Sequence, residues 1–108
     1  MNEARDNAEL GHWSLVANRL YYALFHAASA LLISKGFSVK THGGVISVLG
    51  KELVKTGLLT LEEGNLYSRL YNMRQTGDYD DLFDWTEQDV SPLISKTEAL
   101  IERMKSLL

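Results

Sequence analysis

The stretch from Trp13 to Lys35 constrains the fold of this chain more than any other. It is apolar almost all the way round, which is typical of a buried, central helix. At about 1.5 Å per residue, such a helix is roughly 34 Å long, the width of a small domain. Lys35 in its last turn and Gly36 directly after it predict where the helix ends.

One side of this predicted helix is nevertheless polar. Residues at spacings of three and four form a polar seam along it: Asn18, Arg19, Tyr22, His26 and Ser29. Buried polar groups need partners, because an unpaired one costs on the order of 2–7 kcal/mol. The seam therefore faces water, an internal polar network, or a ligand or partner, and periodicity leaves these alternatives open.

Capping signals predict further helices on both sides of the central one. Residues 2–10 favour a short first helix, and Thr41 can cap a helix over residues 42–54. Thr60 and Glu63 form a capping box for a helix that ends near Gly77. The sequence therefore places short connections between neighbouring helices.

The last helix starts at Thr86 or at Asp89. The second start puts Pro92 in the first turn, where no backbone bond is lost, but the sequence leaves the boundary open. No strand-like alternation persists anywhere in the chain. We therefore expect residues 1–108 to form a single all-α domain, an antiparallel up-and-down bundle of four to five helices.

Composition and charge exclude several classes of protein. The chain has no cysteine, which excludes disulfides and thiolate metal sites. Its histidines, His12, His26 and His42, are scattered, so we expect no metal and no cofactor. The formal net charge is −3, so a whole-molecule basic surface for nucleic acid is missing, although a local one remains open. With no signal peptide and no membrane-spanning run, we expect a cytoplasmic protein.

Four blocks of the chain resemble a known family. They are residues 18–28 (Asn-Arg-Leu-Tyr-Tyr-Ala-Leu-Phe-His-Ala-Ala), Lys40-Thr41-His42, Val54-Lys55-Thr56-Gly57, and Arg74 with Asp78-Tyr79. In this order and spacing they resemble the HEPN domain, and more narrowly its small stand-alone bacterial and archaeal branch. The likeness runs from about Trp13 to the end of the chain. The part before Trp13 is shorter than is usual in such domains, so residues 1–11 look like a shortened first helix.

The resemblance implies a helical bundle that pairs into a symmetric homodimer. It also implies a partner, a minimal nucleotidyltransferase, in a toxin–antitoxin-like module. Many HEPN members are metal-independent ribonucleases, in which an arginine is followed four to six residues later by a histidine. Arg74 matches that arginine, but Asp78-Tyr79-Asp80 stands where the histidine belongs. Ribonuclease activity would therefore need a displaced imidazole from His26 or His42.

Two sets of residues are candidates for a site. The expected phosphate- or nucleotide-binding residues are Arg19, Tyr22, Lys40, Thr41 and His42; the expected catalytic residues are Arg74, His26 and His42. A helix N-terminus that carries a lysine and a histidine suits an anion, and the alternative is a plain capped turn. Arg74 can bind phosphate through its planar fork, and the alternative is an ion pair with Asp78.

The sequence keeps two functions open. In the first, the chain binds a nucleotide or an RNA phosphate and a nucleotidyltransferase partner, and Tyr79 offers its hydroxyl for modification by that partner. In the second, the chain is an endoribonuclease toxin in which Arg74 stabilises charge on the phosphorus and a displaced histidine moves the proton. The missing histidine and the acidic net charge favour the first.

Overall fold

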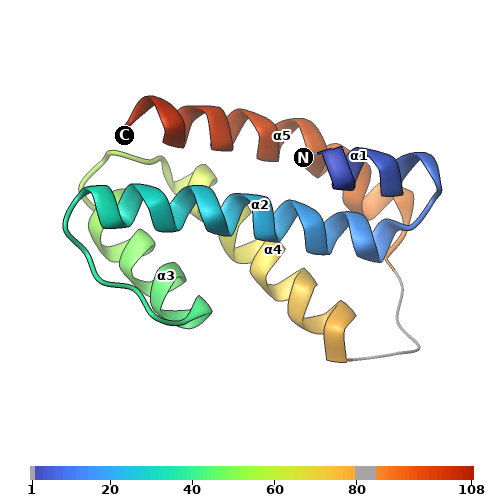
Figure 1. The fold of residues 1–108 in the computed structure, drawn as a ribbon, viewed down its shortest axis with the longest axis horizontal. Helices are drawn as coiled ribbons and strands as arrows, with labels where there is room; N and C mark the ends of the chain where they lie inside the picture. The colour runs from blue at the N-terminus through green and yellow to red at the C-terminus, as the bar shows by residue number, and fades with distance from the viewer. Residues whose placement is uncertain (1, 80–84) are drawn as a thin grey trace.

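The computed structural model describes residues 2–79 and 85–108, and these form a bundle of α-helices (Figure 1). The helices are α1 (Asn2–Glu9), α2 (Trp13–Ser34), α3 (His42–Val48), α4 (Leu61–Tyr79) and α5 (Glu87–Ser106); a π-helix, Leu49–Val54, continues α3. Within the described residues there is no strand. The expected all-α bundle is thus confirmed.

The apolar helix α2 lies at the centre of the bundle. It packs against α5, α4 and α1, and its buried residues supply much of the core, among them Leu20, Tyr21, Leu24 and Leu31. Figure 1 shows α1 and α5 on one side of α2 and α4 crossing it obliquely on the other. The predicted end of the helix is confirmed: Gly36 has φ 89°, and its N–H donates to Ile33 O over 3.0 Å.

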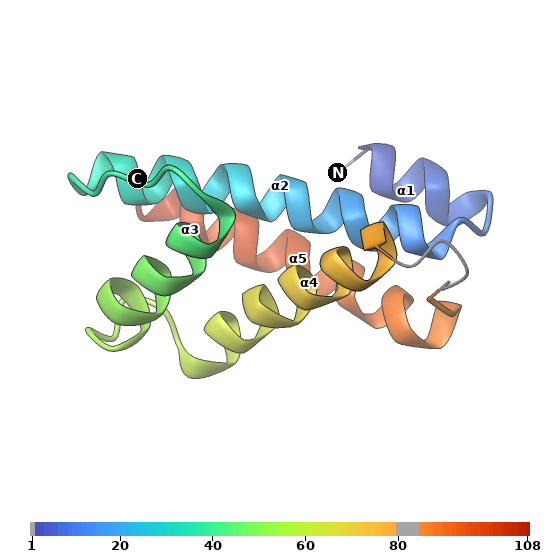
Figure 2. The same cartoon turned by 90° about the horizontal axis from the view of Figure 1, so that it is seen from below.

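The connector after α2 brings α3 back beside the middle of α2 (Figure 2). Thr41 caps α3 as predicted, because its side chain accepts a hydrogen bond of 2.8 Å from Gly44 N–H. The helix expected over residues 42–54 is not uniform, since its second half is the π-helix. Gly64 of α4 lies under this π-helix, and a Cβ there would be 2.8 Å from Val54 Cγ2.

The start of α5, which the sequence left open, is fixed by a capping box. The Thr86 side chain accepts from Asp89 N–H, and the Asp89 carboxylate accepts from Thr86 N–H. Pro92 therefore lies inside the helix and leaves the carbonyl of Gln88 without its helical partner. Gln88 is exposed, so water can satisfy that carbonyl at little cost. Helix α4 extends to Tyr79, two residues beyond the expected end near Gly77.

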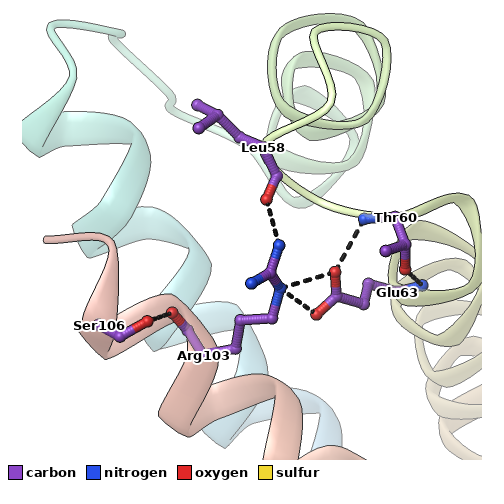
Figure 3. A network of polar contacts seen from close by, with 5 residues as sticks. All are labelled: Leu58, Thr60, Glu63, Arg103 and Ser106. Atoms are coloured by element: carbon purple, nitrogen blue, oxygen red, sulfur yellow. Dashed lines mark hydrogen bonds and ion pairs between the residues drawn. The ribbon is translucent and has the colours of Figure 1, made fainter.

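Ion pairs tie the helices together at their edges. Arg5 of α1 pairs with Glu98 of α5, and Arg19 of α2 pairs with Glu3 of α1 over 3.2 Å. Between α4 and α5, Arg103 contacts both oxygens of Glu63, at 2.9 and 2.7 Å, and donates to Leu58 O (Figure 3). Glu63 also accepts from Thr60 N–H over 2.8 Å, so one carboxylate closes the predicted capping box and binds the neighbouring helix.

We expect Glu63→Ala to destabilise the protein by about 1–2 kcal/mol, because it removes a capping interaction and a partly exposed ion pair. Burial alone would raise the pKa of Glu63, but the Thr60 N–H and Arg103 together hold it below its usual value. This stabilisation is present above the carboxyl's unfolded pKa and is lost as pH falls through the folded one. Urea unfolding at neutral and acid pH measures both effects.

Glu62→Ala is the matched control for this prediction. Glu62 also lies in the first turn of α4 and is exposed, so the variant loses the same charge at the helix N-terminus. It should change the free energy of unfolding by no more than roughly 0.5 kcal/mol. Equal losses in the two variants would assign the effect to the helix dipole rather than to the contacts with Thr60 and Arg103.

Candidate functional site

Helix α3 begins beside the middle of α2 (Figure 2), and side chains from α2, α3 and α4 contact one another there. We name this group the Arg74 cluster: Tyr21, Tyr22 and Phe25 of α2, His42 of α3 and Arg74 of α4. Tyr21 is fully buried, whereas the other four side chains are half-buried. The cluster therefore has a closed base and an outer side that is partly open to solvent.

Arg74 supplies the positive charge of the cluster. Its guanidinium donates to the Tyr22 hydroxyl over 3.0 Å. Its Cζ lies 5.5 Å from the centre of the Tyr22 ring and 5.9 Å from that of Tyr21, within cation–π range. These contacts orient a planar group whose N–H donors match the oxygens of a phosphate or a carboxylate.

His42 is the first residue of α3, where the Thr41 cap fixes the helix start. Its Nδ1 lies 2.6 Å from the Tyr21 hydroxyl, and its ring lies 4.4 Å from that of Phe25. Burial lowers the pKa of His42 below its ordinary value, and the nearby Arg74 and His26 lower it further. The imidazole is therefore neutral at pH 7 and can offer one N–H donor without adding charge.

Tyrosines form the closed base of the cluster. The Tyr21 ring lies 5.9 Å from the rings of both Tyr67 and Tyr71, which α4 presents on consecutive turns. Burial raises the pKa of Tyr21, and burial likewise raises the pKa of Tyr67. Both hydroxyls therefore keep their protons at physiological pH, so Tyr21 and Tyr67 act as neutral hydrogen-bonding groups.

Nearly the whole chain matches one family model. The family model of the HEPN domain covers residues 1–107. This chain belongs to the HEPN domain family. The resemblance inferred from the four sequence blocks is thereby confirmed.

Several curated proteins are similar to this HEPN chain. A UPF0332 protein of Thermotoga maritima is 42% identical over 91 residues, which are 84% of this chain and 69% of that protein. Two proteins of Methanocaldococcus jannaschii, each named "Putative toxin", are 31% and 36% identical, over 89% and 83% of this chain and 65% and 66% of their own lengths. The chain thus spans about two thirds of the length of these relatives.

The HEPN fold brings some of the predicted site residues together and leaves others apart. Arg74, His42 and Tyr22 belong to the Arg74 cluster, and His26 lies near enough to lower the pKa of His42. Arg19, by contrast, is engaged by Glu3 of α1. The phosphate-binding role expected of Arg19 therefore competes with an ion pair between helices.

Lys40 and Thr41 lie directly before α3. Lys40 is exposed, and the Thr41 hydroxyl caps α3 through Gly44 N–H. The hydroxyl's acceptor is thus engaged within the protein. Asp78 and Tyr79 lie in the last turn of α4, but their side chains fall outside the described residues. Their expected roles remain predictions.

The sequence analysis did not identify two aromatic residues of the Arg74 cluster, Tyr21 and Phe25, or Tyr67 at its base. Tyr21 and Phe25 lie in a helix that is apolar on nearly every side, so its pattern gives no sign of which rings share a site. A usable signal was present on α4, where Tyr67, Tyr71 and Arg74 follow at spacings of four and three and so lie on one helix face.

Two features of residues 2–79 and 85–108 concern metal ions and membranes. There, His, Cys, Asp and Glu side chains nowhere gather in threes as a metal ion would require. None of the helices in the same residues combines the length and the apolar character needed to cross a bilayer.

Proposed function

We propose that this HEPN protein binds the phosphate of a nucleotide or of RNA at the Arg74 cluster and works as one half of a toxin–antitoxin-type pair. The observation that carries the proposal is the position of Arg74. Its half-buried guanidinium is oriented by the Tyr22 hydroxyl and by two aromatic rings, next to the neutral imidazole of His42. A fixed guanidinium in a partly desolvated setting suits a phosphate group.

The net charge supports a local site rather than a broad surface for nucleic acid. The chain is acidic overall, at −3, so general attraction to a polyanion is weak. Binding of RNA would then depend on a few oriented groups. This proposal predicts that one or two phosphates are contacted and that loss of Arg74 removes most of the affinity.

The partner and the assembly belong to the same proposal. Two relatives carry the name "Putative toxin", and an antitoxin-type partner follows if this chain acts as they are named. We propose that this partner is a minimal nucleotidyltransferase and that the chain acts as a homodimer. We further propose that residues 1–108 form one domain and that the protein acts in the cytoplasm. Co-expression with the neighbouring reading frame and size-exclusion chromatography with light scattering test the pairing and the dimer.

A second candidate function is metal-independent cleavage of RNA. One observation favours it: His42 and Arg74 contact the same two tyrosines, so a displaced histidine stands beside the arginine. Arg74 would stabilise negative charge on the phosphorus while His42 moves a proton at the ribose or at the leaving oxygen. In this proposal His42 would supply the imidazole that the sequence lacks after Arg74.

One experiment separates the two functions. A fluorescein-labelled single-stranded RNA is titrated with the purified protein in EDTA, its anisotropy is followed at several salt concentrations, and the RNA is then examined on a denaturing gel. Saturable binding of intact RNA that weakens as salt rises supports the binding module. Cleavage in EDTA supports the ribonuclease. If neither labelled RNA nor labelled ATP binds or is cleaved, the proposed function is wrong.

A further inference from the structure

The base of the Arg74 cluster contains a row of hydroxyls that ends at His42. Tyr21 OH lies 2.6 Å from His42 Nδ1, which is a short hydrogen bond between two side chains of low exposure. Tyr67 also contacts Tyr21, and its ring meets the Tyr21 ring edge-on at 5.9 Å. The three residues come from α2, α3 and α4, so the fold itself assembles the row.

The Tyr67 hydroxyl decides the direction of this row. It is fully buried and has no hydrogen-bond partner among the described residues. A buried hydroxyl is costly unless its proton reaches an acceptor, and Tyr21 is close enough to perturb the pKa of Tyr67. We assign the Tyr21 oxygen as the acceptor of the Tyr67 proton, and this assignment leaves the Tyr21 proton for His42 Nδ1.

We infer that Tyr21, supported by Tyr67, is a positioning residue that fixes neutral His42 in the tautomer with its proton on Nε2. In this tautomer Nδ1 accepts from Tyr21, and the opposite side of the ring carries a donor. His42 is then set to donate to an acceptor-rich ligand such as a phosphate oxygen. The same arrangement disfavours His42 as a base through Nε2, because that nitrogen already holds its proton.

The other charged or titratable groups around His42 also favour a neutral ring whose Nδ1 accepts from Tyr21. Arg74 of α4 and His26 of α2 both disfavour a second proton on the ring, and burial acts in the same sense. Tyr22 of α2 is engaged by Arg74, and Tyr71 of α4 accepts a 2.9 Å hydrogen bond from Gln75. The tautomer matters to the ligand only if the proposed function is right, but the tautomer itself can be measured without any ligand.

Long-range proton–nitrogen NMR of uniformly ¹⁵N-labelled protein tests the inference. A His42→Asn variant assigns the His42 ring nitrogens, and exposed His12 reports the tautomer ratio of an unconstrained imidazole. We expect neutral His42 to favour Nε2–H more strongly than His12 does. In Tyr21→Phe the ratio should shift about fivefold toward Nδ1–H, the value of one ordinary hydrogen bond, and the pKa of His42 should rise.

Tyr71→Phe is the matched control, since it removes a hydroxyl from a ring that also contacts Tyr21 but stands outside the row. It should leave the His42 tautomer unchanged. Tyr67→Phe should shift the ratio in the same direction as Tyr21→Phe and by less, and it replaces Tyr21→Phe if that variant fails to fold. A neutral wild-type His42 with its proton on Nδ1, or a His42 ratio equal to that of His12, would overturn the inference.

Failure of this test is distinct from failure of the proposed function. An unconstrained His42 in a protein that still binds labelled RNA through Arg74 would remove the positioning role of Tyr21 alone. A fixed Nε2–H tautomer in a protein that binds neither RNA nor ATP would leave the hydroxyl row intact and remove the phosphate site.

Discussion

Arg74→Ala should weaken the binding of labelled single-stranded RNA by about tenfold to a hundredfold, the value of one or two charge-assisted hydrogen bonds to phosphate. Arg74→Lys keeps the charge but loses the planar fork and should fall between the wild type and the alanine variant. The measurement is the dissociation constant from anisotropy, with circular dichroism to confirm that each variant is folded. If the protein cleaves RNA, the rate should fall by roughly 10²–10³-fold.

Arg69→Ala is the control that gives this result its meaning. Arg69 lies on the same helix, is exposed, and faces Asp89 of α5 instead of the Arg74 cluster. Its removal lowers the net charge by the same amount and should change the affinity by no more than about twofold, as expected for an exposed, solvent-screened charge. Equal losses in both variants would mean that general attraction binds the RNA, and the cluster would lose its assigned role.

Arg74→Ala should also change the pKa of His42, and this change can be measured without any ligand. The positive charge of Arg74 contributes to the lowered pKa of His42. Its removal therefore makes protonation easier, and the pKa of His42 should rise in Arg74→Ala and stay as it is in Arg69→Ala. NMR titration of the His42 ring reads this directly.

Gly64→Ala should have the second large effect. It should lower the free energy of unfolding by about 1–3 kcal/mol, because the added methyl group overpacks the contact between α4 and the π-helix. In a helix free of neighbours the same change would stabilise by up to about 1 kcal/mol. Here the new Cβ would lie 2.8 Å from Val54 Cγ2, and the branched valine has little rotamer freedom with which to move away. Urea unfolding measures the change.

Two further variants isolate the cause of this effect. Gly50→Ala, within the π-helix, meets no atom within 4 Å and should be neutral or stabilising. Val54→Ala combined with Gly64→Ala should recover at least about 1 kcal/mol relative to the sum of the single changes, as expected for residues in contact. A Gly64→Ala protein as stable as the wild type would contradict the close approach of α4 to the π-helix.

The helices of this protein were predictable from sequence because their signals are local. Thr41 and Thr60 each lie within three residues of the N–H that they cap, and Gly36 ends α2 through its own backbone. The start of α5 was harder, because the Thr86 capping box and the preference of Pro92 for a first turn point to different boundaries. The structure follows the two-sided capping box, and Pro92 lies inside the helix at the cost of one backbone hydrogen bond.

The candidate site was predictable only in part, because its geometry depends on contacts between distant segments. Arg74 and His42 were identified one at a time, but their meeting depends on the connector that returns α3 beside α2 (Figure 2). The partner of Arg19 depends likewise on where α1 packs. The π-helix has no sequence signal of its own, since it accompanies the packing of Val54 against Gly64.

The π-helix Leu49–Val54 also determines the angular setting of His42. Each residue of a regular α-helix turns the chain by about 100°. The wider turn of the π-helix therefore rotates the side chains of α3 about the helix axis relative to the residues that follow. Leu53 is buried in the core and anchors the far end. Removing one residue, such as Gly50, would convert the π-helix into a regular α-helix. Leu53 would stay in the core, but the His42 imidazole would rotate away from Tyr21 and lose its contact with the Tyr21 hydroxyl.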